Sequence, residues 1–112
     1  MKELDERGLL ATTTILWIGE FGRTPMINPQ GGRDHFPAAW TCVFGGGGIK
    51  GGQAYGKTSD SGEEVVEGKV DMPDILATLC AAVGVDPGEQ NVSEQGRPIR
   101  IAEGSVIKEI VA

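Results

Sequence analysis

The pattern of apolar and polar residues predicts a mixed α/β chain. Thr12–Ile18 is rich in β-branched and aromatic residues and ends in a continuous apolar run, which is typical of a strand buried on both faces of a parallel sheet. Trp40–Phe44 has the composition of a second short strand. Ile75–Val83 carries apolar residues at helical spacing. We therefore expect an α/β fold with parallel core strands and a covering helix.

Capping and turn residues predict where other elements begin and end. Asp71 is a candidate N-cap for the helix, Pro73 falls in its first turn and Gly84 ends it. Ser59–Gly62 is a polar tip between two β-type runs, which predicts a β-hairpin excursion. The expected strands of this hairpin are Gln53–Thr58 and Glu64–Val70. The other expected elements are a helix end at Lys2–Arg7, a polar loop at Asp86–Gly96, a short edge strand at Arg97–Ile101 and a closing helical turn at Ser105–Val111.

Between the two predicted core strands lies the polar loop Gly19–Trp40. Glycines and prolines punctuate it so heavily that neither helix nor strand is expected. It holds the only histidine of the chain, two carboxylates and two arginines. Polar loops at strand ends are where α/β proteins tend to keep their chemistry, so this loop is the candidate functional region.

Composition and charge limit the possible functions. The 112 residues suffice for one domain, and the formal net charge of −6 argues against a nucleic-acid surface. The two cysteines fall inside hydrophobic segments, which favours buried free thiols over a disulfide or a zinc site. No apolar run reaches the ~20 residues that span a bilayer, and no signal peptide is visible. The compartment is not predicted.

Two glycine-rich signatures are set aside. The sequence from Gly51 to Thr58 matches the phosphate-loop pattern, but that pattern needs a helix to begin at Lys57–Thr58. The chain instead continues into a turn and a probable strand. Gly46–Gly51 fits the dinucleotide fingerprint, but no helix start follows it. Both are better explained as turns between strands.

Glu20, Asp34 and His35 form a candidate metal-ligand set within the polar loop. Imidazole and carboxylate together suit zinc, manganese or a similar divalent ion, and three ligands leave coordination positions for a substrate or water. Arg23 and Arg33 are candidates for binding a small anionic ester. The residue types alone leave a second interpretation open, in which the Asp-His step anchors the loop and the arginines pair with Glu20 and Asp34.

Three motifs resemble one known family. Gly19–Pro25 (Gly-Glu-Phe-Gly-Arg-Thr-Pro), Gly31–Pro37 (Gly-Gly-Arg-Asp-His-Phe-Pro) and Gly46–Gln53 closely resemble the carboxy-terminal part of the domain-of-unknown-function 1501 family. That family looks like a branch of the alkaline phosphatase and sulfatase superfamily. The resemblance extends over essentially the whole chain, including Asp74–Leu79 and Gly96–Ile99. It implies that residues 1–112 are a single carboxy-terminal fragment of a larger alkaline-phosphatase-like domain.

The resemblance also implies a function. Glu20 would take the place of the superfamily's strand-end metal ligand, with Asp34 and His35 as further ligands. The implied chemistry is metal-dependent hydrolysis of phosphate or sulfate esters, with one or two metal ions. The superfamily's nucleophile and remaining ligands lie in the amino-terminal portion, and Phe21 stands where many members have histidine. We therefore expect a partial hydrolase that is inactive alone, and one that self-associates where strands are uncovered. The alternative is a non-catalytic binding or structural module that retains the fold.

Overall fold

The structure is a computed structural model that describes all residues, from Met1 to Ala112. The chain divides into two compact units, which we describe separately. Unit 1 comprises Met1–Ile15, Phe44–Gln53 and Val70–Ala112, and unit 2 comprises Leu16–Val43 and Ala54–Lys69. The longest helix has 11 residues, and no helix combines the length and apolar character needed to cross a bilayer.

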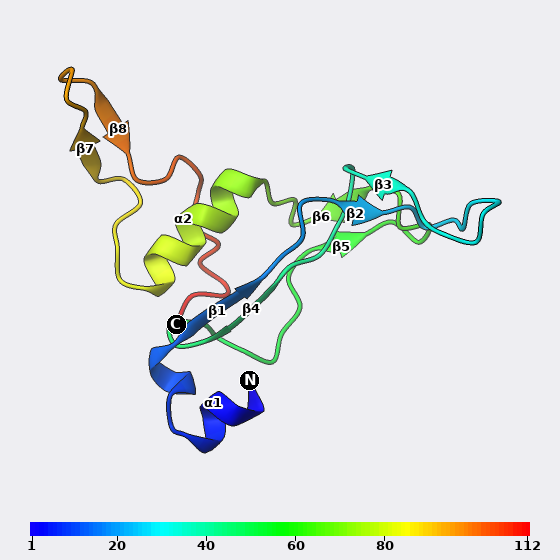
Figure 1. The fold of residues 1–112 in the computed structure, drawn as a ribbon, viewed down its shortest axis with the longest axis horizontal. Helices are drawn as coiled ribbons and strands as arrows, with labels where there is room; N and C mark the ends of the chain where they lie inside the picture. Colours follow the sequence, from blue (N-terminus) through cyan, green and yellow to red (C-terminus); the bar gives the residue numbers. More distant parts are fainter. The chain divides into compact units, whose positions relative to one another are not determined.

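Unit 1 contains the helices of the chain (Figure 1). A short helix α1 (Lys2–Glu6) and a 3-10 turn η1 (Leu10–Thr12) precede the main helix α2 (Met72–Ala82). Asp71 is the N-cap of α2 and a proline stands in its first turn, so the predicted helix and its start are confirmed. The predicted helix end at Lys2–Arg7 is likewise confirmed by α1.

Two side chains of α2 hold the carboxy-terminal segment of the chain. Asp74 Oδ1 accepts a hydrogen bond from the Ser105 N–H at 2.8 Å. The fully buried Thr78 donates its hydroxyl to the Asp74 carbonyl at 2.6 Å and accepts from the Ile107 N–H at 3.0 Å. These bonds hold Ser105–Ile107 to α2. Of the closing helical turn predicted over Ser105–Val111, the structure has a single turn, in which the Ile110 N–H donates to the Ile107 carbonyl at 3.2 Å. Val111 then forms an isolated β-bridge with Ile49.

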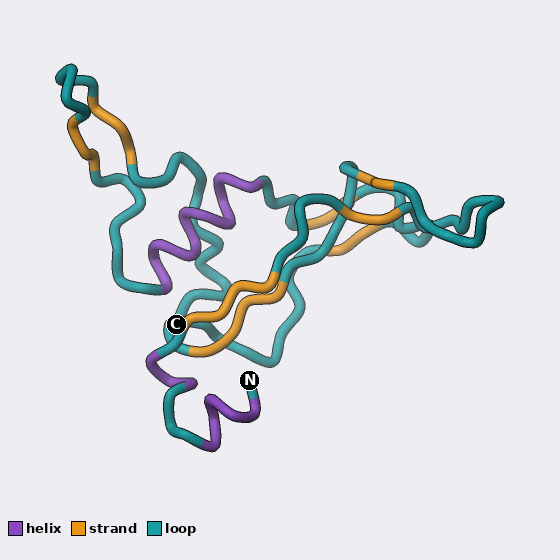
Figure 2. The backbone as a smooth tube through the Cα atoms, in the orientation of Figure 1, coloured by secondary structure: helices purple, strands orange, loops and turns teal.

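A two-stranded sheet joins β1 (Thr14–Trp17) to β4 (Val43–Gly46). Figures 1 and 2 show the two strands side by side, with the chain leaving along β1 and returning along β4. The parallel pairing expected for the core strands is therefore not seen. Within this chain β1 is not buried on both faces as predicted, because no further strand covers it and Trp17 is 76% exposed.

The glycine-rich segment after β4 packs against α2. Gly48 has a φ of +76°, and a Cβ atom added to it would lie 2.0 Å from the Ala82 carbonyl oxygen. Only glycine combines this backbone conformation with so close an approach. The predicted second strand is displaced along the chain. β4 begins three residues later than expected and extends into the glycines.

Unit 1 contains a hairpin that the sequence pattern did not predict. β7 (Gln90–Val92) and β8 (Pro98–Arg100) pair antiparallel, with Asn91 opposite Ile99. The edge strand predicted at Arg97–Ile101 is confirmed by β8, whereas the loop predicted at Asp86–Gly96 contains β7. All six strand residues are exposed, so β7 lacks the apolar alternation that would have indicated it.

Unit 2 consists of two short antiparallel pairs. β2 (Gly22–Arg23) pairs with β3 (His35–Phe36), and β5 (Lys57–Thr58) pairs with β6 (Val65–Glu67). The β5–β6 pair confirms the predicted hairpin, with strands shorter than expected. Because the Lys-Thr step lies in a strand, the phosphate-loop pattern has no helix to complete it. The chain as a whole is mixed α/β, with short strands in small sheets.

Candidate functional site

The polar loop Gly19–Trp40 is more regular than its glycines and prolines predict, because β2 and β3 pair within it. The register sets Arg23 opposite His35 and Gly22 opposite Phe36. Directly opposed residues of an antiparallel pair have Cβ atoms about 4.5–5.5 Å apart. Two predicted site residues, one cationic and one an imidazole, are thus brought together on neighbouring strands.

Phe21 connects these two residues. Its ring stacks on the His35 imidazole with centroids 3.8 Å apart and planes inclined by 29°. The Arg23 guanidinium carbon lies 5.4 Å from the same ring centroid, within cation–π range. Phe21 entered the sequence interpretation only as a missing ligand, whereas in the structure it orients the imidazole.

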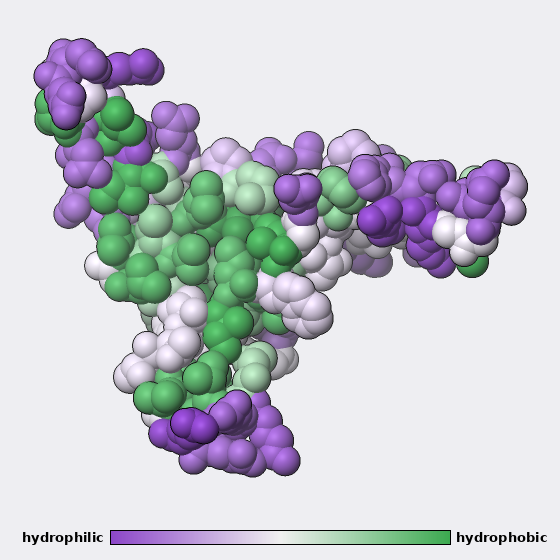
Figure 3. Space-filling model, in the orientation of Figure 1, coloured by the Kyte–Doolittle hydropathy of each residue, from purple (hydrophilic) through white to green (hydrophobic).

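Arg33 and Asp34 are used within the loop itself. The Arg33 guanidinium donates to the Thr24 carbonyl at 2.7 Å and also to the Pro25 carbonyl. Asp34 Oδ1 accepts from the Asn28 side-chain amide at 2.9 Å, and its backbone N–H donates to the Thr24 hydroxyl. These contacts fix the long excursion between β2 and β3, whose surface in Figure 3 is mostly hydrophilic, although Met26 and Ile27 are exposed on it.

Glu20 is exposed and lies two residues before β2, next to Phe21. No salt bridge joins it or Asp34 to either loop arginine, since the two ion pairs of the structure lie within α1 and its C-cap. The charge pairing considered for Glu20 and Asp34 is therefore not seen. No three His, Cys, Asp or Glu side chains of the chain lie close enough together to hold a metal ion.

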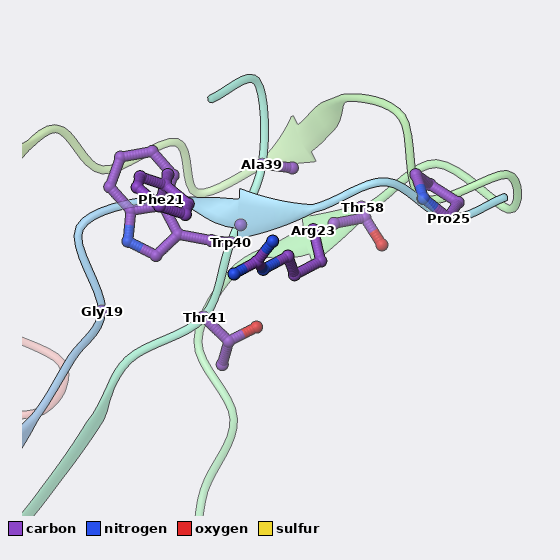
Figure 4. Close-up of a pocket in the computed structure, with 10 residues that line it drawn as sticks. Gly19, Phe21, Arg23, Pro25, Ala39, Trp40, Thr41 and Thr58 are labelled. Carbon is purple, nitrogen blue, oxygen red and sulfur yellow. The ribbon is translucent and has the colours of Figure 1, made fainter. Parts of the chain in front are cut away.

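A pocket of about 470 Å³ opens beside β2, entirely within unit 2. Figure 4 shows Arg23 on β2, Trp40 and Thr41 on the segment that precedes β4, and Thr58 on β5. The residues that line it are Gly19, Phe21, Gly22, Arg23, Pro25, Ala39, Trp40, Thr41, Thr58 and Gly62. Most of them lie in the loop Gly19–Trp40 that the sequence indicated as the functional region, but Arg23 is the only one predicted as a site residue. Two aromatic residues of that glycine-rich loop, Phe21 and Trp40, were an available signal.

The pocket wall depends on a close contact at Gly22. A Cβ atom added there would lie 2.2 Å from the Ala39 carbonyl oxygen and 2.9 Å from Trp40 Cβ. Glycine therefore allows β2 to lie directly against the segment that carries Trp40. Next to this wall, burial raises the pKa of the Cys42 thiol above its ordinary value and outweighs an opposing backbone hydrogen bond. A reactive thiolate is not expected there.

The motif residues of this loop find their counterpart among known families. Residues 1–111 match the family described as Protein of unknown function (DUF1501). The chain belongs to the DUF1501 family. The match covers both units, so the predicted resemblance to DUF1501 is confirmed. Comparisons of this DUF1501 chain with curated proteins and with solved structures give no match.

Proposed function

We propose that this DUF1501 chain is the carboxy-terminal part of a metal-dependent hydrolase of phosphate or sulfate esters, of the alkaline phosphatase and sulfatase type. The observation that carries the proposal is the β2–β3 register, which sets His35 opposite Arg23, a residue that lines a pocket. An imidazole suits a transition metal and a guanidinium suits the oxygens of an anionic ester. Metal-dependent hydrolysis of an anionic ester can use both.

In this proposal His35 is the principal metal ligand that the chain provides, with Glu20 and Asp34 as further ligands. Asp34 uses Oδ1 for Asn28, so its other oxygen would be the one available to a metal. A divalent ion would supply charge neutralisation at the ester oxygens. In this structure Glu20, Asp34 and His35 do not form one group that could hold a metal ion, so we assign no reaction step to a metal held by this chain alone.

Arg23 is the anion contact that the pocket favours, because it lines the pocket and Arg33 does not. Arg33 would act by holding the loop through the Thr24 carbonyl. The nucleophile and the remaining ligands would come from an amino-terminal part of the same domain, whose strands would complete a parallel core around β1. Its 76% exposed Trp17 is consistent with such a partner strand.

The test uses a parent protein that contains this chain. We expect the parent to retain zinc or manganese after gel filtration and to hydrolyse an aryl phosphate or sulfate. His35→Phe keeps an aromatic ring on Phe21 and removes both nitrogen donors, so it should lower metal affinity by at least about tenfold. Asn91→Ala, on the exposed strand β7, is the control. Equal metal content in the parent and in His35→Phe would remove His35 from the site.

One observation favours the alternative, a binding or structural module without catalysis. Arg33 donates a hydrogen bond to the backbone of the loop, and Asp34 bonds Thr24 and Asn28 within the same loop. Such contacts are typical of residues with a structural role. A folded parent that binds no divalent metal and hydrolyses neither class of ester would support this alternative. Metal content and ester hydrolysis of the parent protein therefore distinguish the hydrolase from the non-catalytic module.

A further inference from the structure

Apart from Arg23, the residues that line the pocket of unit 2 have no role in the metal-site proposal. Arg23 is the only charged residue that lines it, and no acidic side chain does. Thr41 and Thr58 bring hydroxyl groups, and Phe21 and Trp40 bring aromatic rings. Small-molecule sites commonly have volumes of about 300–1,000 Å³ and combine apolar or aromatic walls with a few polar groups that fix orientation. The pocket's volume of about 470 Å³ falls within that range.

We infer that this pocket binds the organic part of an anionic ester, with a flat ring against Phe21 and Trp40 and the ester group at Arg23. The assignment of this ligand as a substrate rests on the proposed hydrolase function. The ring is either an aryl group or a pyranose, since both present a flat face to an aromatic side chain. Binding itself requires only residues of unit 2.

The guanidinium of Arg23 is held in place by one hydrogen bond and keeps N–H donors for an anionic ligand. Its Nη1 donates to the Arg33 carbonyl at 3.1 Å, which uses one of the five N–H donors of the group. Its guanidinium carbon lies over the Phe21 ring, 5.4 Å from the centroid, so the charge is held against one of the aromatic residues of the pocket. A ligand that carries its anion close to a ring suits a pocket lined by this guanidinium and by two aromatic residues.

The aromatic walls are held in place before any ligand arrives. The stack on His35 orients Phe21, and the contact of Gly22 with the Ala39–Trp40 backbone sets the position of Trp40. Trp40 remains 36% exposed, so part of its surface is available to a ligand. Walls that are fixed in advance lower the entropic cost of binding.

The test measures binding without metal, in the presence of EDTA, on the full 112-residue chain. Trp17→Phe leaves Trp40 as the sole tryptophan, so its fluorescence reports the pocket. Phenyl phosphate and glucose 6-phosphate are the aryl and sugar probes, and methyl phosphate carries the anion without a ring. We expect at least one ring ester to bind about tenfold or more tightly than methyl phosphate. The ring ester that binds more tightly shows whether the pocket prefers an aryl group or a pyranose.

Arg23→Gln should weaken the binding of that ring ester by at least about tenfold, as expected for loss of a charge-assisted hydrogen bond. Arg97→Gln makes the same charge change outside the pocket and should leave binding unchanged. Arg23→Lys, which keeps the charge, should bind with intermediate affinity. The comparison of ring esters with methyl phosphate is made on a chain whose pocket residues are unchanged. It therefore tests the inference even if Arg23→Gln fails to fold.

Similar affinities for ring esters and methyl phosphate, or an unchanged affinity in Arg23→Gln, would overturn the inference. Failure of the hydrolase proposal has a different signature, because it appears as a parent protein without metal or turnover. A ring ester that binds to a metal-free, inactive parent would retain the pocket and remove only the catalytic role.

Discussion

Phe21 and His35 lie against each other as a stacked pair, with ring centroids 3.8 Å apart, although fourteen positions separate them in the chain. The β2–β3 pairing produces this contact, since Arg23 opposes His35 and Phe21 immediately precedes β2. The imidazole therefore has a defined orientation before any ligand binds. Its orientation is a property of unit 2 alone.

The stack can be tested through the single histidine of the chain. A phenyl ring 3.8 Å from an imidazole should displace the His35 ring-proton resonances by its ring current. Phe21→Leu should move these resonances to ordinary histidine positions and cost about 1 kcal/mol of stability. Phe44→Leu, which removes an aromatic ring from unit 1, should leave them in place. Unchanged His35 shifts in Phe21→Leu would contradict the stacked arrangement.

Gly22 should tolerate no side chain. Gly22→Ala would place Cβ 2.2 Å from the Ala39 carbonyl oxygen, so backbone must move, and we expect a loss of about 1–3 kcal/mol in urea unfolding together with a shift in Trp40 fluorescence. Gly32→Ala is the matched control, because its Cβ would lie 3.7 Å from the Asn28 side chain. Equal stabilities of the two variants would show that β2 does not lie so close to the Trp40 segment.

Local signals predicted the elements that depend on local interactions. Asp71 and the following proline correctly marked the start of α2, and the polar tip Ser59–Gly62 marked the β5–β6 hairpin. Here the residues that define each element lie within a few positions of one another. Capping and turn chemistry is therefore sufficient to find them.

The site could be predicted only in part, because its contacts are with backbone groups distant in sequence. The sequence identified Arg33 as a charged residue, but nothing in it indicates that the guanidinium binds the Thr24 carbonyl. The pocket was missed for a similar reason, since Trp40 and Thr58 come from different segments. The apolar run that ends at Ile18 predicted neighbours on both faces, and the chain itself does not supply them.

The stability of unit 1 should fall in acid through Asp74. Hydrogen bonds from the backbone N–H groups of Ser105 and then Asp71 lower the pKa of Asp74 from its ordinary value of 3.8. Because the folded pKa lies below the unfolded one, the stabilisation is complete above the unfolded pKa and is lost as pH falls through the folded pKa. Asp74→Asn should therefore be less stable than the wild type at neutral pH.

The difference between the wild type and Asp74→Asn should narrow below pH 3.8, as thermal melts across a pH series would measure. Asp60→Asn is the control, since that carboxylate lies on the turn of the β5–β6 hairpin in unit 2. A difference that stays constant with pH would mean that the Asp74 carboxylate does not bind Ser105 and Asp71 in the folded state.

The exposed tryptophan of β1 should make the chain self-associate. Trp17 and Met26 are each 76% exposed, but Trp17 lies in a two-stranded sheet with open edges, which are templates for pairing with another chain. Sedimentation velocity should show the average mass rising with concentration. Trp17→Gln should reduce that rise, and Met26→Gln, which removes equal exposure from a loop, should not.

If both substitutions reduced association equally, exposed apolar area rather than the sheet would be its cause. A chain that stays monomeric at high concentration and melts in one sharp transition would go further, because it would show that β1 needs no covering strand. The proposal that the amino-terminal part of a larger domain completes this sheet would then lose its structural support. The pocket beside Arg23 would be unaffected, since all its residues belong to unit 2.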